Sequence, residues 1–304
     1  MSSTIRIFSG LAAVLLIQTA GAQDRPKSLP EAEAVVASLH FQTGEIPLRN
    51  GLATVRVPEG MRFLNGRDAN TVLVSLWGNP PSEEPLGMLM PDVSPLSGES
   101  WAIILSYSDD GYVEDEEAGK IDYGQLLKEM QKGTQQANKA REKSGYEKVE
   151  LVGWAAPPRY DQTAKKLYWA KELKFGDAPE ENTLNYDIRL LGRRGVLVLG
   201  AVASMTQLPQ IEQQVPAILA AVDFNPGHRY ADFSQAAGDK VAEYGIGALI
   251  AGGVAAKMGL FKTLWVAIIA GKKFIIMAVV AIGAWAVNFW RNRSSAEPAS
   301  TDSR

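Results

Sequence analysis

Three consecutive segments in the second half of the chain leave little freedom for its fold, because each has the residue pattern of a β-strand. Residues 166–175 (KLYWAKELKF) and 183–191 (TLNYDIRLL) place large apolar side chains on one face, and residues 195–203 (GVLVLGAVA) are apolar throughout. An uninterrupted apolar run is typical of a central strand that is buried on both faces. The Gly-Arg-Arg-Gly sequence at 192–195 predicts a hairpin turn. We therefore predict an antiparallel sheet.

Helices and further strands are predicted around this sheet. A helix over about residues 208–222 follows the third strand, and residues 29–39 have the apolar spacing of a short helix. Residues 48–64 predict a strand, an Asn-Gly turn and a second strand, and residues 101–107 predict another strand. Two aspartates are placed to cap helices that follow them, Asp68 and Asp122. The predicted fold class is α+β, an antiparallel sheet with helices packed on it.

The N-terminus has the pattern of a secretory signal peptide over residues 1–22. Arg6 gives a positive start, residues 8–17 form a short apolar core, and Ala20 and Ala22 are small residues at the expected cleavage site. The apolar core is too short to span a bilayer. We expect the mature chain to begin near Gln23 in an exported compartment.

The C-terminal region contains a stretch that predicts a transmembrane helix, residues 274–290 (FIIMAVVAIGAWAVNFW). It carries no charge, and Asn288 is its only strongly polar side chain. At ~1.5 Å per residue it makes about 25 Å of helix, near the lower limit for spanning a bilayer. Arg291 and Arg293 follow at once and act as a stop.

The stretch before it, residues 241–273, is glycine-rich and apolar, and four lysines interrupt it. Small residues recur every three or four positions, a spacing that lets helices approach closely in lipid. The lysines fit either an interfacial amphipathic helix, from which they reach toward water, or a tilted first span. Both alternatives stay open at this point.

Two membrane topologies follow. In a hairpin topology Lys272 and Lys273 mark an inner turn, whereas a single pass places the tail in the cytoplasm and needs no lysine at membrane depth. We favour the single pass. The predicted organisation is a signal peptide, an exported α+β globular domain, the glycine-rich amphipathic or membrane segment, a C-terminal transmembrane helix and a polar tail, at residues 1–22, 23–240, 241–273, 274–290 and 291–304.

Composition excludes several classes of function. The chain has no cysteine, which removes disulfides, thiolate nucleophiles and Cys-bound metals. Its two histidines, His40 and His228, are too few for a His-rich metal site, and we expect His228 to lie in an ordered connector at 223–233. A net charge of −3 and a pI near 5.6 argue against a nucleic-acid partner. No phosphate-binding loop, zinc-protease or nucleophile-elbow motif is present, so we predict no cofactor and no metal.

The acidic run within residues 105–117 (LSYSDDGYVEDEE) raises the question of a metal site. With Ser106 in the first position its spacing fits a calcium loop, but a strand rather than a helix precedes it, and the first ligand is not Asp. We interpret it as a strand-to-helix turn with its bend at Asp110 and Gly111. Its carboxylates are expected to face water and to favour the N-terminus of the next helix.

Candidate site residues come from the charged positions of the expected sheet and this turn. Paired carboxylates for acid–base work could come from Asp109, Asp110, Glu172 and Asp187, although spacing alone does not show that any two converge. Arg189, with Glu172, could form a ligand cluster on the polar sheet face if a loop covers it. Such a face is more commonly hydrated. The binding candidates are therefore Asp110, Glu172, Asp187 and Arg189.

Several sequence blocks together resemble a known family. They include LWGNPP, LGMLMPD, IDYGQLLKEM, VGWAAPPRYD, LNYDIRLLGRRGVLVLGAVA, FNPGHRYADF and KVAEYGIGALIAGGVAAK. In this order they are similar to a bacterial family of uncharacterised membrane-anchored proteins, domain of unknown function family 2167, over roughly residues 48–290. The resemblance implies export and anchoring, and it implies no activity. The ending of the sheet and its helix also resembles the PsbP-like fold.

These observations predict a non-enzymatic binding or interaction protein of the cell envelope. We expect it in the bacterial inner membrane as a single-pass protein with its main domain on the periplasmic side. Its partners would be membrane lipid, through the C-terminal helix, and an envelope protein or component. The alternative is a membrane-bound hydrolase that uses carboxylates of the exported domain. The oligomeric state is not predicted.

Overall fold

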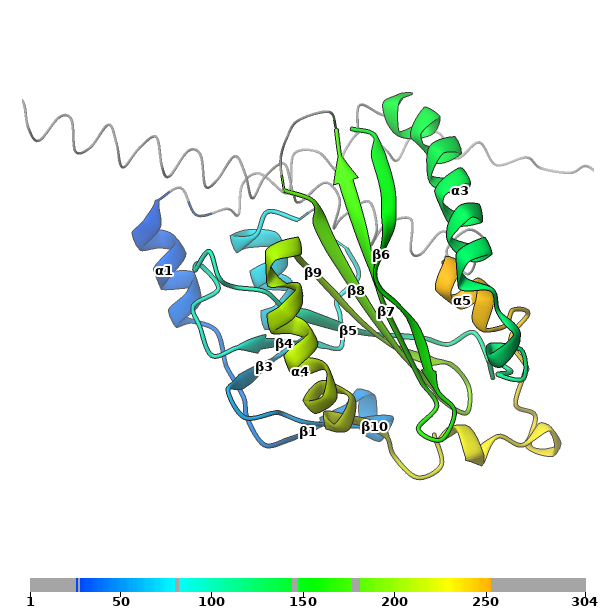
Figure 1. Cartoon of the computed structure of the whole chain (residues 1–304). Helices are drawn as coiled ribbons and strands as arrows, with labels where there is room; N and C mark the ends of the chain where they lie inside the picture. Colours follow the sequence, from blue (N-terminus) through cyan, green and yellow to red (C-terminus); the bar gives the residue numbers. More distant parts are fainter. Residues whose placement is uncertain (1–25, 27, 80–81, 144–146, 177–180, 253–304) are drawn as a thin grey trace, which may run out of the picture.

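A computed structural model of the chain describes residue 26 and residues 28–79, 82–143, 147–176 and 181–252 (Figure 1). The predicted signal peptide, transmembrane helix and tail lie outside the described residues, as does the part of 241–273 after residue 252. Among the described residues, no helix combines the length and the apolar character needed to cross a bilayer.

The centre of the described structure is an antiparallel sheet of seven strands, so the predicted α+β class with an antiparallel sheet is confirmed. In spatial order its strands are β3 (Met61–Asn65), β4 (Gly87–Pro91), β5 (Ile103–Ser108), β9 (Val196–Ser204), β8 (Thr183–Leu191), β7 (Lys166–Phe175) and β6 (Val149–Asp161). The three segments with the clearest strand pattern became β7, β8 and β9. The hairpin turn between β8 and β9 is confirmed, with the Gly192 N–H donating to the Gly195 carbonyl oxygen at 2.8 Å.

A smaller sheet holds β1 (Glu45–Leu48), β2 (Ala53–Arg56) and β10 (Val222–Phe224), with β2 in the middle. The predicted Asn-Gly turn joins β1 to β2. Asn50 and Gly51 have φ of +55° and +85°, the left-handed region that asparagine tolerates and glycine adopts freely.

The helices are α1 (Leu29–Ala37), α2 (Gly66–Thr71), α3 (Tyr123–Lys143), α4 (Leu208–Ala221) and α5 (Ile246–Ala251), and a π-helical turn (Val72–Leu76) continues α2. Asp122 caps α3 as predicted, because its Oδ1 accepts hydrogen bonds from two backbone N–H groups of the first turn. The prediction that Asp68 caps a helix is wrong. Asn65 is the cap of α2, and its side chain accepts the Asp68 N–H at 2.9 Å.

One face of the large sheet is covered by α4 and the small sheet (Figure 1). Alternate residues of β8 point to this face, as their period of two requires, and they pack against Ile211, Val215 and Ile218 of α4. A fully buried Leu or Ile side chain contributes about 1.5–3 kcal/mol relative to an exposed one. This apolar layer is therefore the main source of stability.

The opposite face is covered by α3, α5 and the loop between β5 and α3 over β9, β8 and β7, and by α2 and its π-helical turn over β3 and β4. Trp169 of β7 and Val198 of β9 pack there against Ile246 and Ile250 of α5. Residues 246–251, which belong to the glycine-rich stretch of the sequence, thus lie on the sheet.

Strand β6 was not predicted from the sequence. Its alternation is interrupted by Pro157 and Pro158, and its pairing with β7 shifts register at three points. Proline is tolerated there because β6 is an edge strand. Part of that edge is covered by α3: the Asn138 side chain donates to the Val149 carbonyl oxygen and accepts from its N–H, both at 2.9 Å.

Candidate functional site

The acidic loop, residues 109–117, contacts residues 239–251, which follow the connector at residues 223–233. Its predicted bend is confirmed, since Gly111 has φ of +104°. The prediction that its carboxylates face water is wrong for Asp110 and Asp115, which are partly buried, whereas Glu117 stays exposed although it also bonds this segment. Asp110 accepts a hydrogen bond from the Tyr244 hydroxyl at 2.9 Å, and Glu117 accepts the Gly247 N–H at 3.0 Å. We call residues 239–251 the C-terminal segment; backbone bonds of Tyr112 to its residues 240 and 242, both 2.8 Å, complete the contact.

Asp115 is a second partly buried carboxylate of the acidic loop, with its side chain 11% exposed. It accepts hydrogen bonds from the Tyr160 hydroxyl at 2.5 Å, the Lys165 Nζ at 2.7 Å and the Tyr230 hydroxyl at 3.0 Å. Burial acts to raise the pKa of Asp115, but these donors outweigh it and hold the pKa below its usual value. Tyr112 stacks on the Tyr230 ring with centroids 4.2 Å apart. Asp115 therefore fixes the connector to the β6–β7 turn.

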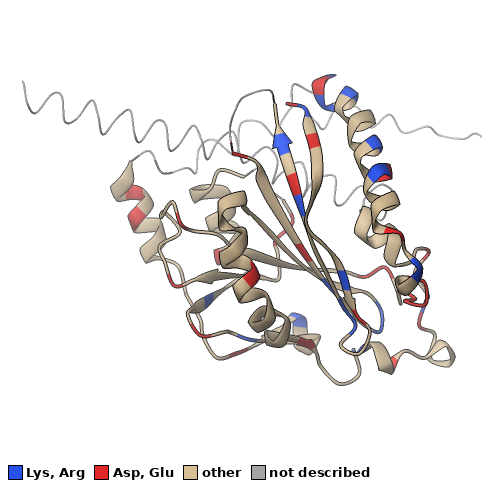
Figure 2. Cartoon of the chain, in the orientation of Figure 1, with Lys and Arg blue, Asp and Glu red and all other residues tan. Residues whose placement is uncertain are grey.

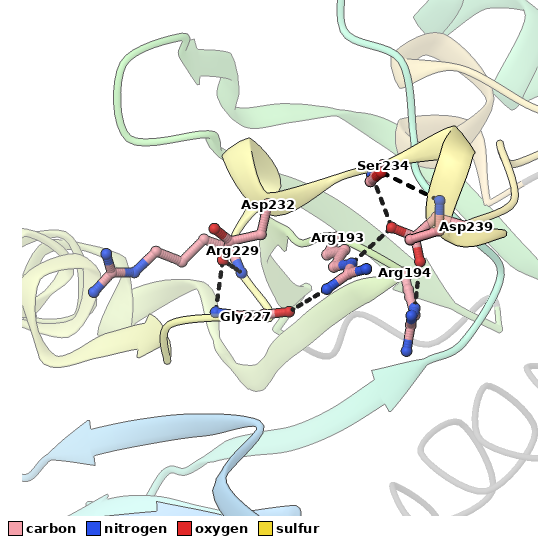
Figure 3. A network of polar contacts seen from close by, with 8 residues as sticks. Arg193, Arg194, Gly227, Arg229, Asp232, Ser234 and Asp239 are labelled. Carbon is pink, nitrogen blue, oxygen red and sulfur yellow. Dashed lines mark hydrogen bonds and ion pairs between the residues drawn. The ribbon is translucent and has the colours of Figure 1, made fainter.

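Asp239 joins the C-terminal segment to the β8–β9 turn (Figure 3). Its side chain is 0% exposed and accepts from Arg193 Nε and Arg194 Nε, each at 2.6 Å, and from the Ser234 N–H at 2.8 Å. The hydrogen bond from Arg193 contributes most to the lowered pKa of Asp239, burial opposes it, and Arg194 adds to the lowering. The sequence analysis did not identify Asp115 or Asp239. The adjacent arginines Arg193 and Arg194 in a tight turn were a signal that could have indicated a carboxylate partner such as Asp239.

The polar residues of β8 are buried, so the expectation of a hydrated sheet face is wrong. Asp187 lies between Lys171 Nζ at 3.1 Å and Arg189 Nη2 at 2.9 Å, and all three side chains are at most 10% exposed. Burial acts to raise the pKa of Asp187, but the charges of Lys171 and Arg189 outweigh it and lower the pKa. The Arg189 guanidinium lies over the Trp169 ring, 5.2 Å from its centroid.

The four sequence candidates are therefore not one site. Asp187 and Arg189 are brought together. Glu172 pairs in register with Leu184 and so lies on the opposite sheet face, where its Oε1 accepts from Asn182 Nδ2 at 2.5 Å. Asp110 lies in the acidic loop with Tyr244. Among the described residues, no group of three or more His, Asp or Glu is arranged to hold a metal ion.

An open cleft of about 500 Å³ lies between the small sheet, the β6–β7 turn and the connector. It is lined by Thr54, Arg56, Thr163, Ala164, Lys165, Lys166, Leu190, Leu191, Asp223, Phe224, Asn225, Arg229, Tyr230 and Ala231. Sequence reasoning missed this cleft, because its walls come from three parts of the chain that only the fold brings together. None of the four sequence candidates lines it.

Three of the four cations that line the cleft already have carboxylate partners. Arg56 pairs with Glu45 at 2.8 Å and Lys165 with Asp115 at 2.7 Å. Lys166 pairs with Asp223 at 2.6 Å and donates to two backbone carbonyl oxygens as well.

Arg229 differs from these three. Its side chain has no carboxylate partner among the described residues. Its Nε donates a long hydrogen bond, 3.5 Å, to the Phe224 carbonyl oxygen. Asp223 is the one lining carboxylate, and it is occupied by Lys166. The cleft thus offers positive charge and N–H donors rather than a pair of groups for proton transfer.

Comparisons with known proteins identify a family of unknown function. The family model described as "Protein of unknown function (DUF2167)" matches residues 40–283. No curated protein matches the chain. The solution structure of cyanobacterial PsbP (CyanoP) from Synechocystis sp. PCC 6803 is 11% identical, covering 62% of this chain and 94% of that one, with a TM-score of 0.32. The Saccharomyces cerevisiae Ran-binding protein Mog1p is 11% identical, covering 65% and 100%, with a TM-score of 0.35. Both TM-scores are too low to support an argument.

Proposed function

Because the chain belongs to the DUF2167 family, whose function is unknown, we propose a function from its own residues: a membrane-anchored binding protein of the bacterial cell envelope. Residues 274–290 hold the chain in the inner membrane as a single pass. The exported domain lies on the periplasmic side and binds an envelope component without transforming it.

The binding part rests on one observation, the contrast between the paired interior charges and the cleft. The carboxylates of Asp115, Asp187 and Asp239 form ion pairs with cations of the same domain. In the cleft, by contrast, Arg229 faces an open volume without a carboxylate partner among the described residues. A cation that is exposed in a cleft and unpaired is available to a ligand.

The hydrolase alternative gains no support from this geometry. A pair of catalytic carboxylates needs two groups at one site, and Glu172 and Asp187 lie on opposite sheet faces. Asp187 is also held by Lys171 and Arg189, and its lowered pKa makes it a poor proton donor at neutral pH.

The anchoring part is tested by fractionation and protease accessibility. The full chain should sediment with membranes and leave them only with detergent, whereas a chain ending at residue 273 should appear in the periplasmic fraction that osmotic shock releases from intact cells. A tag after Arg304 should be resistant to protease that digests the exported domain, as the single pass requires. A digested tag would indicate the hairpin topology. Full-length protein in the soluble fraction with residue 1 retained would refute the proposal.

A further inference from the structure

The cleft concentrates positive charge at the meeting point of three elements. Four cationic side chains line it against one carboxylate, Asp223. Glu45 and Asp115 lie outside the lining and neutralise Arg56 and Lys165. Arg229 is the lining cation that has no carboxylate partner among the described residues. The carboxylates of Asp161 and Asp232 lie beside the lining and accept backbone N–H groups. A cleft lined mainly by one sign of charge, with apolar walls such as Leu190 and Phe224, favours a ligand of opposite charge.

Arg229 is presented by an ordered turn. The Asp232 carboxylate accepts hydrogen bonds from the Gly227 N–H at 2.8 Å and the Arg229 N–H at 2.9 Å. Arg193 holds the same turn through the Gly227 carbonyl oxygen at 3.2 Å. In Figure 3 the Arg229 side chain points away from the arginines that converge on Asp239. Its backbone is therefore fixed, and binding need order only the side chain.

The facing wall is also held in place. Lys165 has φ of +56°, a left-handed conformation that is uncommon for a residue other than glycine, and Asp115 and the Tyr230 ring fix its ammonium group. Thr163, two positions before it in the β6–β7 turn, also lines the cleft. Arg56 stands on the small sheet and is exposed.

We infer that this cleft binds a phosphate group, with Arg229 as its principal cation and Arg56 and Thr163 as further donors. The guanidinium forks of arginine donate paired hydrogen bonds to phosphate oxygens, and a tetrahedral anion accepts donors from several directions. The inference rests on the proposed binding function and specifies its ligand class. The phosphate could belong to a lipid headgroup or to a soluble phosphate ester of the envelope.

The experiment uses the full chain in neutral detergent with inorganic phosphate as the probe, titrated by calorimetry at low ionic strength. The wild-type protein should bind phosphate saturably. Arg229→Gln should weaken binding about tenfold or more, the scale of a lost charge-assisted hydrogen bond. Arg56→Gln should weaken it less, because Glu45 already engages Arg56. Arg67→Gln, at an exposed position on α2 outside the cleft lining, is the matched control and should bind as the wild type does.

Nanodiscs separate the two sources of phosphate. If the ligand is a lipid headgroup, phosphate binding should be weaker in phosphatidylglycerol discs than in discs of a neutral glycolipid that carries no phosphate, and Arg229→Gln should remove that difference. If the ligand is a soluble ester, glycerol phosphate should bind equally in both discs. Either result supports a phosphate site.

The inference is overturned if the wild type shows no saturable phosphate binding, or if Arg229→Gln and Arg67→Gln behave alike while both keep the wild-type melting temperature. Such a result leaves the anchored binding protein itself standing. That wider proposal fails through fractionation, a measurement in which Arg229 has no part.

Discussion

The two faces of the large sheet bury different kinds of side chain. The face under α4 is mainly apolar, with Lys166 and Glu172 as its charged strand residues, and α4 itself carries Glu212 as its one charged residue. The face under α3 and α5 buries the group of Lys171, Asp187 and Arg189 beside apolar side chains. Figure 2 shows the same difference, with charged residues along α3 and the neighbouring strands and few on α4.

The two faces therefore contribute differently to the fold. The apolar face contributes mainly to its stability, and the charged face fixes how its elements are oriented. Apolar contacts are non-directional, so the α4 face favours a compact structure without dictating how its parts are oriented. Ion pairs and hydrogen bonds require particular geometries. On the other face they fix the acidic loop, the connector and the C-terminal segment in one arrangement, at a desolvation cost that their partners offset.

The largest effect is expected for Asp187→Leu, which would leave Lys171 and Arg189 as buried charges without their carboxylate. It should lower the free energy of unfolding by about 3–5 kcal/mol, as much as a large core truncation such as Leu184→Ala on the α4 face. Chemical denaturation measures both. Replacing Lys171, Asp187 and Arg189 together by apolar residues of similar volume should restore most of the loss. If Asp187→Leu alone cost less than about 1 kcal/mol, the three charged side chains would be hydrated rather than buried.

The next prediction is that the stability of the fold decreases in acid. Asp115, Asp187 and Asp239 have folded-state pKa values below their ordinary values, so each contributes stability that is present above about pH 4 and is lost as pH falls through its folded pKa. Unfolding temperatures measured from pH 7 to pH 2 should therefore fall most steeply below about pH 4. Asp239→Asn should flatten this profile, since one of the titrating groups is gone. An unchanged profile in that variant would contradict the assignment.

A smaller effect is expected for Asp115→Ala. Lys165 and the hydroxyls of Tyr160 and Tyr230 would lose a common acceptor, at a cost of about 1–3 kcal/mol. Urea denaturation measures the loss. Glu114→Ala, in the same loop, should cost less than about 0.5 kcal/mol because it lies on the surface. Equal losses in the two variants would show that the carboxylate has no special partners.

The smallest effect is expected for Tyr244→Phe, which removes the hydroxyl that donates a hydrogen bond to Asp110 and keeps the ring. The cost should be about 0.5–1.5 kcal/mol. Tyr168→Phe, on β7, is a comparison outside the acidic loop. Thermal denaturation of the two variants side by side would test whether Asp110 binds the C-terminal segment, since similar melting temperatures for both would argue that it does not.

The parts of the fold that the sequence predicted are those whose cause is local. A period of two reveals β7 and β8, an unbroken apolar run reveals β9, and Asn50 with Gly51 marks a turn that few other residue pairs adopt. Strand β6 escaped because prolines and register shifts interrupt its alternation, and an edge strand tolerates both.

The candidate site was less predictable, because charge on a strand does not reveal what covers it. Asp187 and Arg189 stand two positions apart, so their shared face follows from the strand, but their burial depends on the elements packed over them. The cleft depends on residues that are far apart in the chain, such as Arg56 and Arg229. No local spacing relates them.

The central claim is that the acidic loop and the paired aspartates hold the C-terminal segment on the sheet. Native-state amide hydrogen exchange of the full chain in detergent tests it most directly, at the N–H groups of Tyr112 and Ala242, which donate across the contact. We expect both amides to be protected in the wild type, and to exchange much faster in the double variant Asp115→Asn and Asp239→Asn while those of β8 and β9 stay protected. Amides that exchange freely in the wild type, or that stay equally protected in the double variant, would contradict the claim.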